Sequence, residues 1–574
     1  MQCGGTHEDR IAQLEAELAA ERAALAAERA SLVAERERTA ALTQERDHLR
    51  SSHERLRLEL DLLRRRIFVA KAERVDSRQL ELEFAAKLAE LDKLGGLVPE
   101  RGEGADDDPK GKTRKKPKGR RDLRQLVLEE ERVEIFDPLF ERLVEQGKAE
   151  RIDFEESYKL AWKRGGLRRL VVARAKYKVT NDRGEAQIET APKPVECFKR
   201  SLAAPSLLAK IIVDKYCDGL PLHRIEKRFA RDGVPIDRGT MCRWVEEAGG
   251  TAGATVVTAA KKDALATALC IATDATGVLV QPIPTHEKRH QPCRRGHYFV
   301  SIADCEHVFF DYTPKENGRV VSDLFRGYSG YIQADAKSVY DVLFRPPGKR
   351  KPPDLDDGAT RAEVACWSHC RRGLWEATYT KSPVAREGLA RIGRIFELDA
   401  SWADKPPSEI LRLRQAHLRP HMEAFFAWAA QQLELVRHEK GLLRSALGYA
   451  CNHKDALMRV LDDGHLVLDN NRSERELRQI AVGRKAWLFV GSDDHGTSAG
   501  HLFSLIASCR LHGLDPETYL RELFRVLAHW PRDRYLELAP KYWASTRDRL
   551  VARELELEIG SLTIPPPSQE QPAS

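Results

Sequence analysis

Leucine recurs at heptad spacing along residues 1–70. The segment 7–69 contains neither Gly nor Pro and is rich in Ala, Glu, Arg and Leu, which predicts one long helix. A phase shift divides the repeat, whose apolar positions are Ile11, Leu18, Leu25 and Leu32, then Leu42, Leu49, Leu56 and Leu63. We therefore expect a coiled coil over 1–70 that joins protomers into a homo-oligomer, most strongly near 56–67. An antiparallel hairpin with another part of the chain is the alternative.

The segment 71–124 changes from a helical pattern to a charged linker. A helix is predicted near 79–94, and the stretch after it is rich in Gly, Pro and charge and poor in apolar residues. Nine of the fifteen residues 110–124 are basic, among them Lys115, Lys116, Arg120 and Arg121. Such a run could neutralise DNA phosphates without reading sequence. A solvated linker explains the pattern equally well.

Two small segments precede the main α/β pattern. Residues 125–200 are rich in strand formers, with LRRLVVARAKYKV as the clearest strand. Three helical patterns follow within 201–250, and the third opens at Asp237 or Thr240. This arrangement resembles a helix-turn-helix, in which Arg238 and Arg243 would face DNA. A purely structural packing of three helices is the alternative.

Apolar runs and helical patterns alternate over residues 262–500. The predicted strands are LATALCIATD, which ends at Asp274 and is followed by the apolar stretch VLVQPIP, then HYFVSIAD, HVFFDY, GYIQADA, which ends at Asp335, and EVACWSH. Helices are predicted near 320–325, near 337–343 and from about residue 370. Three early strands followed by alternating helices and strands is the order of a ribonuclease-H-like α/β core. AWLFVG, with Trp487 and Phe489, predicts a core strand rather than a base-stacking surface.

Three carboxylates are the candidate chemical groups of this region. Asp274 and Asp335 stand where strands are predicted to end, and two buried carboxylates near each other favour a hard divalent cation such as Mg²⁺. A single Asp after a strand often only caps a helix. Glu474 lies in LDNNRSERELR, where Asp469 and two asparagines are predicted to form a turn and cap a helix. A surface ion pair between Glu474 and Arg478, four residues apart, is the alternative.

Length and composition narrow the class of protein. A chain of 574 residues exceeds the size of one domain, so several units are expected. The eleven Cys lack the spacing of a disulfide framework, and we find neither a signal peptide nor an apolar run of membrane-spanning length. These observations predict a protein of the reducing cytoplasm with no membrane partner. The net charge of +7 is modest, so the basic residues of 110–124 stand out.

Several blocks of the sequence resemble the insertion-sequence-66 family of DDE transposases. The longest, LLRSALGYACNHKDALMRVLDDGHLVLDNNRSERELRQIAVGRKAWLFVGS, is similar to the family's C-terminal catalytic segment. GYIQADAKSVY, ACWSHCRRGL, KYCDGLPLHRIEKRF and RRRIFVAKAERVDSRQLEL are similar to other blocks of the family. The resemblance covers most of the chain in the right order, and DNNRSER followed by GRKAWLF is its most specific part.

The resemblance implies a fold, a chemistry and partners. The fold would be ribonuclease-H-like with a helical insertion at about 375–460, followed by a C-terminal helical segment (501–548) and a tail (549–574). Two Mg²⁺ or Mn²⁺ ions on Asp274, Asp335 and Glu474 would support cleavage at transposon ends and transfer of the 3′-hydroxyl strand. Partners would be double-stranded DNA, as terminal inverted repeats and target, and accessory proteins of the same element in the bacterial nucleoid. Phosphates would be held by His369, Arg371, Arg372, Arg478, Arg484 and Lys485.

The sequence also departs from the family pattern. Residues 125–196 contain no Cys, although the family usually carries Cys-x-x-Cys pairs there, so no zinc is expected in that segment. Ala275, Ala336, Lys337 and Ala486 replace the usual Glu, Gly, Tyr and Asn. A catalytically inactive relative that binds DNA and assembles without cutting is therefore the alternative function.

Two further clusters have ligand-like spacing. HEKRHQPCRRGH contains His286, His290, Cys293 and His297, and CWSHC contains Cys366, His369 and Cys370. The first is also strongly basic and leads into a predicted strand, so a loop that faces DNA explains it as well. Zinc is not expected at either cluster.

Overall fold

The computed structural model describes most of the chain after the basic linker. The described residues are 128–567 without 164, 181–185, 200, 283–291, 351 and 381, together with Leu123 and Leu126. The predicted coiled coil lies outside these residues, and so do Lys115, Lys116, Arg120 and Arg121. Within the described residues, every helix falls short of the length and apolar character needed to cross a membrane.

The first described segment is a four-stranded sheet with one helix. Its elements are β1 (Glu129–Ile135), α3 (Pro138–Glu145), β2 (Ala149–Lys163), β3 (Gly166–Thr180) and β4 (Ala186–Thr190). β3 contains the strand predicted from LRRLVVARAKYKV and pairs in parallel with β1 and antiparallel with β2 and β4. The hydroxyl of Tyr177 in β3 donates to Glu141 of α3 at 2.7 Å, which fastens α3 to the sheet.

Helical elements connect this sheet to the next one. They are α4 (Pro205–Tyr216), α5 (Leu222–Arg231), α6 (Arg238–Ala248), a π-helical turn (Gly249–Gly253) and α7 (Ala254–Thr267). Asp237 caps α6, because its Oδ1 accepts a hydrogen bond from the Gly239 N–H at 2.8 Å. The strand predicted to begin at Leu265 is wrong at its start, since α7 continues to Thr267. The Ala-rich stretch before Cys270 suits a helix better than a strand.

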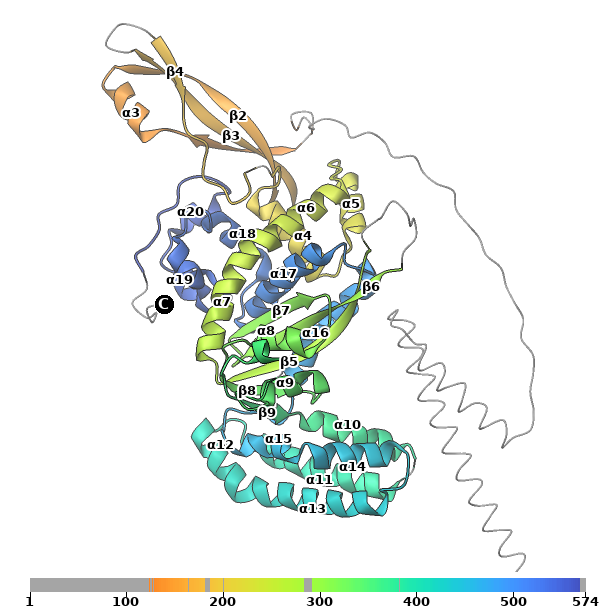
Figure 1. Ribbon diagram of the computed structural model, residues 1–574. Helices are drawn as coiled ribbons and strands as arrows, with labels where there is room; N and C mark the ends of the chain where they lie inside the picture. The colour runs from red at the N-terminus through yellow and green to blue at the C-terminus, as the bar shows by residue number, and fades with distance from the viewer. Residues whose placement is uncertain are drawn as a thin grey trace, which may run out of the picture. The chain divides into compact units, whose positions relative to one another are not determined.

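The second sheet has five strands in the order β7-β6-β5-β8-β9 (Figure 1). Its elements are β5 (Cys270–Val280), β6 (Arg294–Ala303), β7 (His307–Thr313), α8 (Gly318–Leu324), β8 (Gly330–Ala334), 3₁₀ turns (Ser338–Tyr340, Pro353–Leu355), α9 (Asp341–Phe344) and β9 (Arg361–Ala365). β5, β8 and β9 run parallel, whereas β6 and β7 are antiparallel to their neighbours. The predicted element order of this region is confirmed, and β5 joins its parallel and antiparallel halves.

The helices after β9 form a separate apolar cluster. They are α10 (Trp367–Thr378), α11 (Pro383–Ala400), α12 (Pro407–Leu413), a π-helical turn (Arg414–Leu418), α13 (Arg419–Leu435), α14 (Leu442–Asn452), α15 (Lys454–Met458) and a 3₁₀ turn (Arg459–Leu461). Trp367, Phe425 and Phe426 pack together at its centre with ring centroids 5.3–5.6 Å apart. The chain then returns to the sheet through α16 (Asn471–Trp487).

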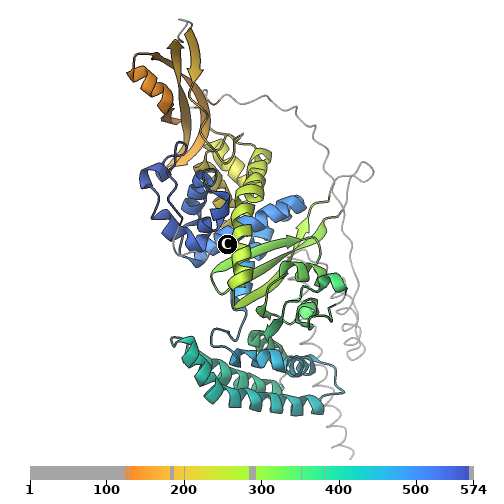
Figure 2. The same cartoon turned by 60° about the vertical axis from the view of Figure 1, so that its left-hand side comes forward.

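The last helices continue the core of the five-stranded sheet. They are α17 (Asp493–Leu511), α18 (Pro516–Val526), a 3₁₀ segment (Arg532–Leu538), α19 (Pro540–Arg547) and α20 (Ala552–Glu556). Leu502, Phe503 and Ile506 of α17 and Leu520 and Phe524 of α18 belong to the same buried cluster as the strands. In the two views, α17 is the blue helix beside β7 (Figures 1 and 2).

α17 covers the β7 edge of the sheet with a face of small residues. Gly496, Gly500, Ser504 and Ser508 recur every four residues, so they share one face of the helix. A Cβ atom at Gly500 would collide with the carbonyl oxygen of Phe310, which shows how closely the backbones approach. The Ser504 hydroxyl accepts from the Phe310 N–H at 2.8 Å, and the Ser508 hydroxyl accepts from the Val308 N–H at 3.0 Å. The helix therefore satisfies donors that an edge strand would otherwise leave unpaired.

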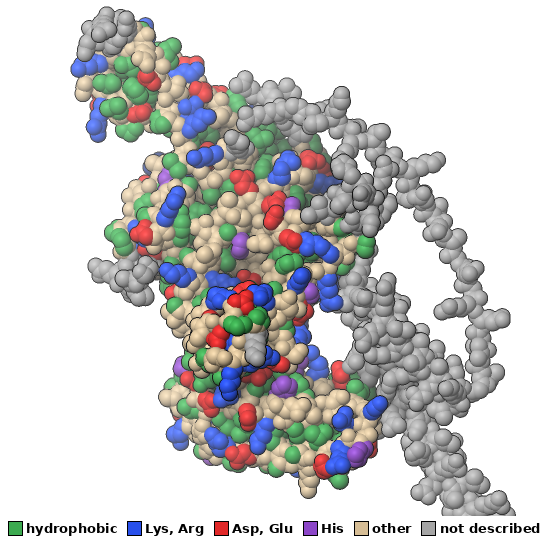
Figure 3. Space-filling model, viewed as in Figure 1, with side chains coloured by type: hydrophobic (Ala, Val, Ile, Leu, Met, Phe, Trp, Pro, Cys, Tyr) green, Lys and Arg blue, Asp and Glu red, His purple; other side chains and the backbone are tan. Residues whose placement is uncertain are grey.

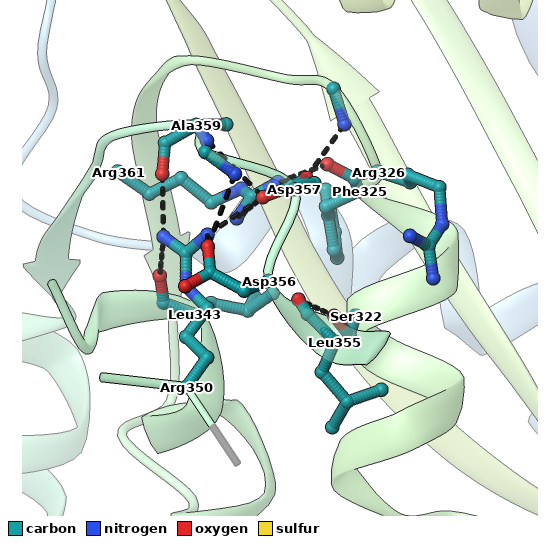
Figure 4. A network of polar contacts seen from close by, with 12 residues as sticks. Ser322, Phe325, Arg326, Leu343, Arg350, Leu355, Asp356, Asp357, Ala359 and Arg361 are labelled. Atoms are coloured by element: carbon teal, nitrogen blue, oxygen red, sulfur yellow. Dashed lines mark hydrogen bonds and ion pairs between the residues drawn. The ribbon is translucent and has the colours of Figure 1, made fainter. Parts of the chain in front are cut away.

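A buried charge network holds the connection between β8 and β9. The Asp357 carboxylate accepts hydrogen bonds from Arg350, at 2.6 Å, and from Arg361, and both guanidinium groups also donate to backbone carbonyls (Figure 4). The Arg350 and Arg361 side chains are at most 1% exposed. Charged side chains of both signs also gather on the surface over α8 (Figure 3). Burial alone would raise the pKa of Asp357, but the hydrogen bonds from Arg361 and from the Gly327 N–H lower it overall.

We expect that Ser504→Ala and Ser508→Ala will each lower the free energy of unfolding by about 1–3 kcal/mol, because each leaves a buried β7 N–H without an acceptor. Urea denaturation followed by Trp fluorescence measures this change. Ser545→Ala is the matched control, since the exposed Ser545 hydroxyl bonds only to its own helix. Equal stability of the Ser504, Ser508 and Ser545 variants would contradict this account of the edge.

Asp357→Asn should lower the free energy of unfolding at neutral pH by about 3–5 kcal/mol, because the buried Arg361 loses its counter-charge and the buried Arg350 keeps only Asp356, at 3.6 Å. Since the folded-state pKa is depressed, the stabilisation is complete above the ordinary Asp pKa of about 3.9 and is lost as the pH falls below it. The wild-type and Asp357→Asn unfolding curves should therefore converge in acid.

The control is Asp354→Asn, because Asp354 and its partner Arg319 are more than half exposed. That variant should cost less than about 1 kcal/mol. A gap between wild type and Asp357→Asn that stays constant as the pH falls would show that the depressed pKa does not stabilise the fold.

Candidate active site

Asp274 lies within strand β5 rather than at its end. β5 continues to Val280 because β6 pairs with it along its full length, with Asp274 opposite Val300. The predicted strand end is therefore wrong. The parallel pairing of β5 with β8 stops at Ala272, however, so Asp274 follows the last residue that β8 covers. Asp274 therefore still lies just beyond the parallel-paired part of β5.

Asp335 directly follows β8, as predicted. The next two residues, Ala336 and Lys337, place a positive charge beside its carboxylate. Ala336 has φ of +59°, a left-handed conformation that favours Gly over Ala. The Lys337 ammonium group then lies 2.9 Å from Asp335 Oδ2 and 3.7 Å from Asp274 Oδ1. One side-chain cation thus bridges the carboxylates of two adjacent parallel strands.

The charges around Asp274 oppose one another. Burial raises its pKa, and the negative charges of Asp335 and Glu474 raise it further. The Lys337 ammonium and the Ala275 N–H, which donates to Asp274 Oδ1 at 2.7 Å, work in the other direction. Burial also disfavours the charge of Lys337, but Asp335 and Asp274 raise its pKa overall. The site therefore concentrates negative charge that a cation stabilises.

Glu474 lies in the first turn of α16 and faces two basic side chains of α10. Its carboxylate lies 3.3 Å from the guanidinium of Arg372 and 3.6 Å from the imidazole of His369. Among the ion pairs of the described residues, Arg478 is not a partner of Glu474, so the surface pair considered from the sequence is not formed. The three acidic residues interact electrostatically, but Glu474 is paired with α10 rather than with Lys337.

Asn470 and Arg484 fasten α16 to β5. The buried Asn470 amide donates to the Thr273 carbonyl at 2.8 Å, and its backbone N–H donates to the Cys366 thiol at 3.2 Å. Near the other end of the helix, Arg484 donates to the Thr276 hydroxyl at 3.1 Å and to the Gly277 carbonyl at 2.6 Å. Both ends of α16 are therefore held against the strand that carries Asp274.

The asparagine pair of LDNNRSER acts differently from the cap that its sequence predicted. The predicted turn is present, since Asp469 accepts from the Asn471 N–H at 3.1 Å. Asn470 occupies the N-cap position but makes no side-chain capping bond, and its Nδ2 donates to the Thr273 carbonyl of β5 instead. Sequence reasoning missed Asn470 as a positioning residue, and it noted Lys337 only as a departure. Two adjacent Asn between an apolar run and a helix were the available signal.

The residues predicted to contact DNA have different surroundings. Arg371 and Arg372 of α10 are exposed, and the Arg371 guanidinium lies 5.9 Å from the centroid of the Phe396 ring. The half-buried Arg484 is engaged with β5, so its guanidinium helps to hold the helix. The other predicted DNA contacts are exposed: Arg238, Arg243, Arg478 and Lys485. Contact of any of these residues with phosphates remains a prediction.

Within the described ranges, no set of three or more His, Cys, Asp or Glu side chains is arranged to hold a metal ion. Cys366 and Cys370 are buried, and the Cys366 thiol accepts the Asn470 N–H. His286 and His290 lie outside the described residues. The acidic cluster offers two carboxylates around one cation, with Glu474 paired elsewhere.

AWLFVG is not the core strand that its alternating pattern predicted. α16 runs to Trp487, Leu488 has φ of +65°, and the Phe489 side chain is 41% exposed. Only Val490 joins the sheet, through an isolated bridge to Val280. The pattern failed because contacts with β5 decide where α16 ends and which residue joins the sheet, and β5 lies far away in the sequence.

Comparison with known proteins gives two family matches and several relatives. The family model described as "Transposase IS66 family" matches residues 200–498, and the model "IS66 C-terminal element" matches residues 504–540. Similar curated proteins from Sinorhizobium fredii include the uncharacterized proteins y4qI and y4hP. Identity to y4qI is 27% over 65% of this chain and 68% of the relative, and identity to y4hP is 25% over 62% and 65%. The match thus spans about two thirds of each relative.

Proposed function

The chain belongs to the IS66 family of transposases, and we propose that it cleaves DNA at transposon ends and transfers the 3′-hydroxyl strand into target DNA. The observation that carries this proposal is the meeting of Asp274 and Asp335 around one cation, with Glu474 close enough to raise the pKa of Asp274. Acidic side chains from two adjacent strands and a following helix suit phosphodiester chemistry, because they can hold hard cations beside a phosphate.

We propose a ribonuclease-H-like fold for the five-stranded sheet. The strand order β7-β6-β5-β8-β9 supports it, since three antiparallel strands are followed by two strands parallel to β5. The helices between β9 and α16 form their own apolar cluster, which supports a helical insertion. The proposed partners are double-stranded DNA, further copies of the chain through residues 1–70, and accessory proteins of the element.

The acidic residues fit a divalent cation, Mg²⁺ or Mn²⁺. The ammonium of Lys337 stands in for it, because this group already places a positive charge between Asp335 and Asp274. Carboxylate oxygens are the ligands that such hard ions prefer. Asp274, Asp335 and Glu474 would hold two ions, with Lys337 displaced and Glu474 released from Arg372. The local negative charge favours this exchange.

The protein's own groups would prepare the substrate for the reaction. Bound metal ions would activate the attacking oxygen and stabilise the leaving oxygen. Once Glu474 turns from α10 toward the Asp pair, Arg372 and His369 are free to hold a DNA phosphate beside the site. Asn470 and Arg484 keep α16 on β5, so Glu474 changes partner by rotating its side chain.

A catalytically inactive relative that binds DNA is the second candidate. The position of Lys337 favours it, because this cation must leave before a metal ion can bind both Asp274 and Asp335. The two candidates differ in one observable, which is metal-dependent cutting of a DNA end by a protein that binds it.

The functional test is cleavage of a labelled duplex that carries the element's own end, with Mg²⁺ or Mn²⁺ and the neighbouring gene products. We expect Asp274→Asn, Asp335→Asn and Glu474→Gln each to abolish strand cleavage while DNA affinity stays near that of the wild type. Glu476→Gln is the matched control on the same helix and should still cut. Nicking that persists in one of the three variants removes that residue from the site, and a wild type that binds without cutting establishes the inactive relative.

Lys337→Met should tighten Mn²⁺ binding about fivefold, because it removes a competing cation from a partly exposed ion pair worth about 1 kcal/mol. Isothermal titration calorimetry of the full chain with Mn²⁺ measures this without any DNA cleavage. Lys349→Met, on an exposed lysine, is the control and should bind Mn²⁺ like the wild type. Equal affinities of the wild type and Lys337→Met would show that the ammonium does not compete for the metal position.

A further inference from the structure

A strained turn follows α16. The Phe489 N–H donates to the Trp487 carbonyl at 2.8 Å across Leu488, whose φ and ψ are +65° and −46°. This is the geometry of a classic γ-turn, which is rare and costly for a residue with a side chain. Val490 exchanges backbone hydrogen bonds with Leu279 and Gln281 at 2.8 Å, so the turn is fixed on the far side as well. Strain of this kind persists only where the surroundings impose it.

The turn presents apolar side chains to the surface. Leu488 and Phe489 are 40% and 41% exposed, and Trp487 is half-buried. They border a cavity of about 440 Å³, which Pro221 and Leu222 at the start of α5 also line. Apolar and aromatic walls around a space of this size are typical of ligand sites.

Basic side chains also line the cavity. Lys215 and Arg238 belong to no ion pair between described residues, and burial lowers the pKa of the Lys215 ammonium to about 8. The imidazole of His223 lines the cavity as well. The acidic Glu246 is paired with His495 at 3.1 Å. Within the described chain, the Lys215 and Arg238 side chains therefore line this cavity without a carboxylate partner of their own. An aromatic wall beside unpaired cations suits a ligand that combines a flat ring with a phosphate.

We propose that this cavity binds an unpaired DNA base, which stacks on Phe489 while Lys215 and Arg238 hold the adjoining phosphates. Base stacking on aromatic side chains tolerates any sequence and is strengthened by nearby cations. The proposal rests on the proposed function only in taking DNA as the substrate. α16 separates the turn from Glu474 by 13 residues, about 20 Å along a helix. That distance is about six nucleotides of a strand at about 3.4 Å each.

The test compares two fluorescein-labelled single strands of equal length, one of thymidines and one abasic. Both carry the same phosphates, and fluorescence anisotropy is measured with the full chain in EDTA, so that no cleavage occurs. The wild type should bind the thymidine strand more tightly than the abasic strand. Phe489→Ala should weaken binding of the thymidine strand at least about fivefold, the lower end for one stacked base. Its binding of the abasic strand should not change.

Phe136→Ala is the matched control, because Phe136 is 39% exposed and lies before α3. It should keep the preference for bases. Phe489→Trp should also keep it, whereas Phe489→Leu, which is apolar without an aromatic face, should lose it. Equal wild-type affinity for the two strands, or an unchanged preference in Phe489→Ala or Phe489→Leu, overturns the proposal and leaves an apolar protein segment as the occupant. Because the assay contains no metal, its outcome is independent of whether the protein cuts.

Discussion

Two carboxylates that meet across neighbouring parallel strands repel each other unless a positive charge lies between them. The pairing of β5 with β8 fixes the backbones of Asp274 and Asp335, so neither can withdraw far from the other. Burial adds to the repulsion, as the raised pKa of Asp274 shows. The sheet therefore creates a place for a cation, and the Lys337 ammonium lies there. The identity of the cation is decided by competition rather than by the fold.

The third acidic residue depends on how α16 is attached. Asn470 and Arg484 bond the two ends of the helix to β5, one on each side of Asp274. A helix held at both ends moves little as a body. The partner exchange proposed for Glu474, from Arg372 and His369 to the Asp pair, then needs only rotation about its own side-chain bonds. The backbone of Glu474 is thus held in place even though its carboxylate is paired with α10 and not with the two Asp residues.

The sequence predicted most strands of the sheet because their burial is visible locally. β6 and β8 are apolar runs bounded by polar residues, and such runs identify buried strands without reference to the rest of the chain. The end of β5 and the turn after Trp487 were wrong for one shared reason, since both are set by partners distant in sequence. The ion pairs of Lys337 with Asp335 and Asp274 could not be predicted either, because a pattern of apolar and polar residues does not show which groups a long side chain reaches.

The most specific block of the sequence, DNNRSER followed by GRKAWLF, spans α16 from end to end. Asn470 is its N-cap residue and Glu474 lies in its first turn, whereas Trp487 is its last residue and Phe489 follows two residues later. If the block served only to hold metal ligands, the strained and exposed turn at Leu488 would have no reason to accompany it. Under the two proposals made for this chain, a helix with the acidic site at one end and an aromatic surface at the other would fix where a strand is cut relative to a base held about 20 Å away. The two ends of α16 would then act together on the same DNA strand.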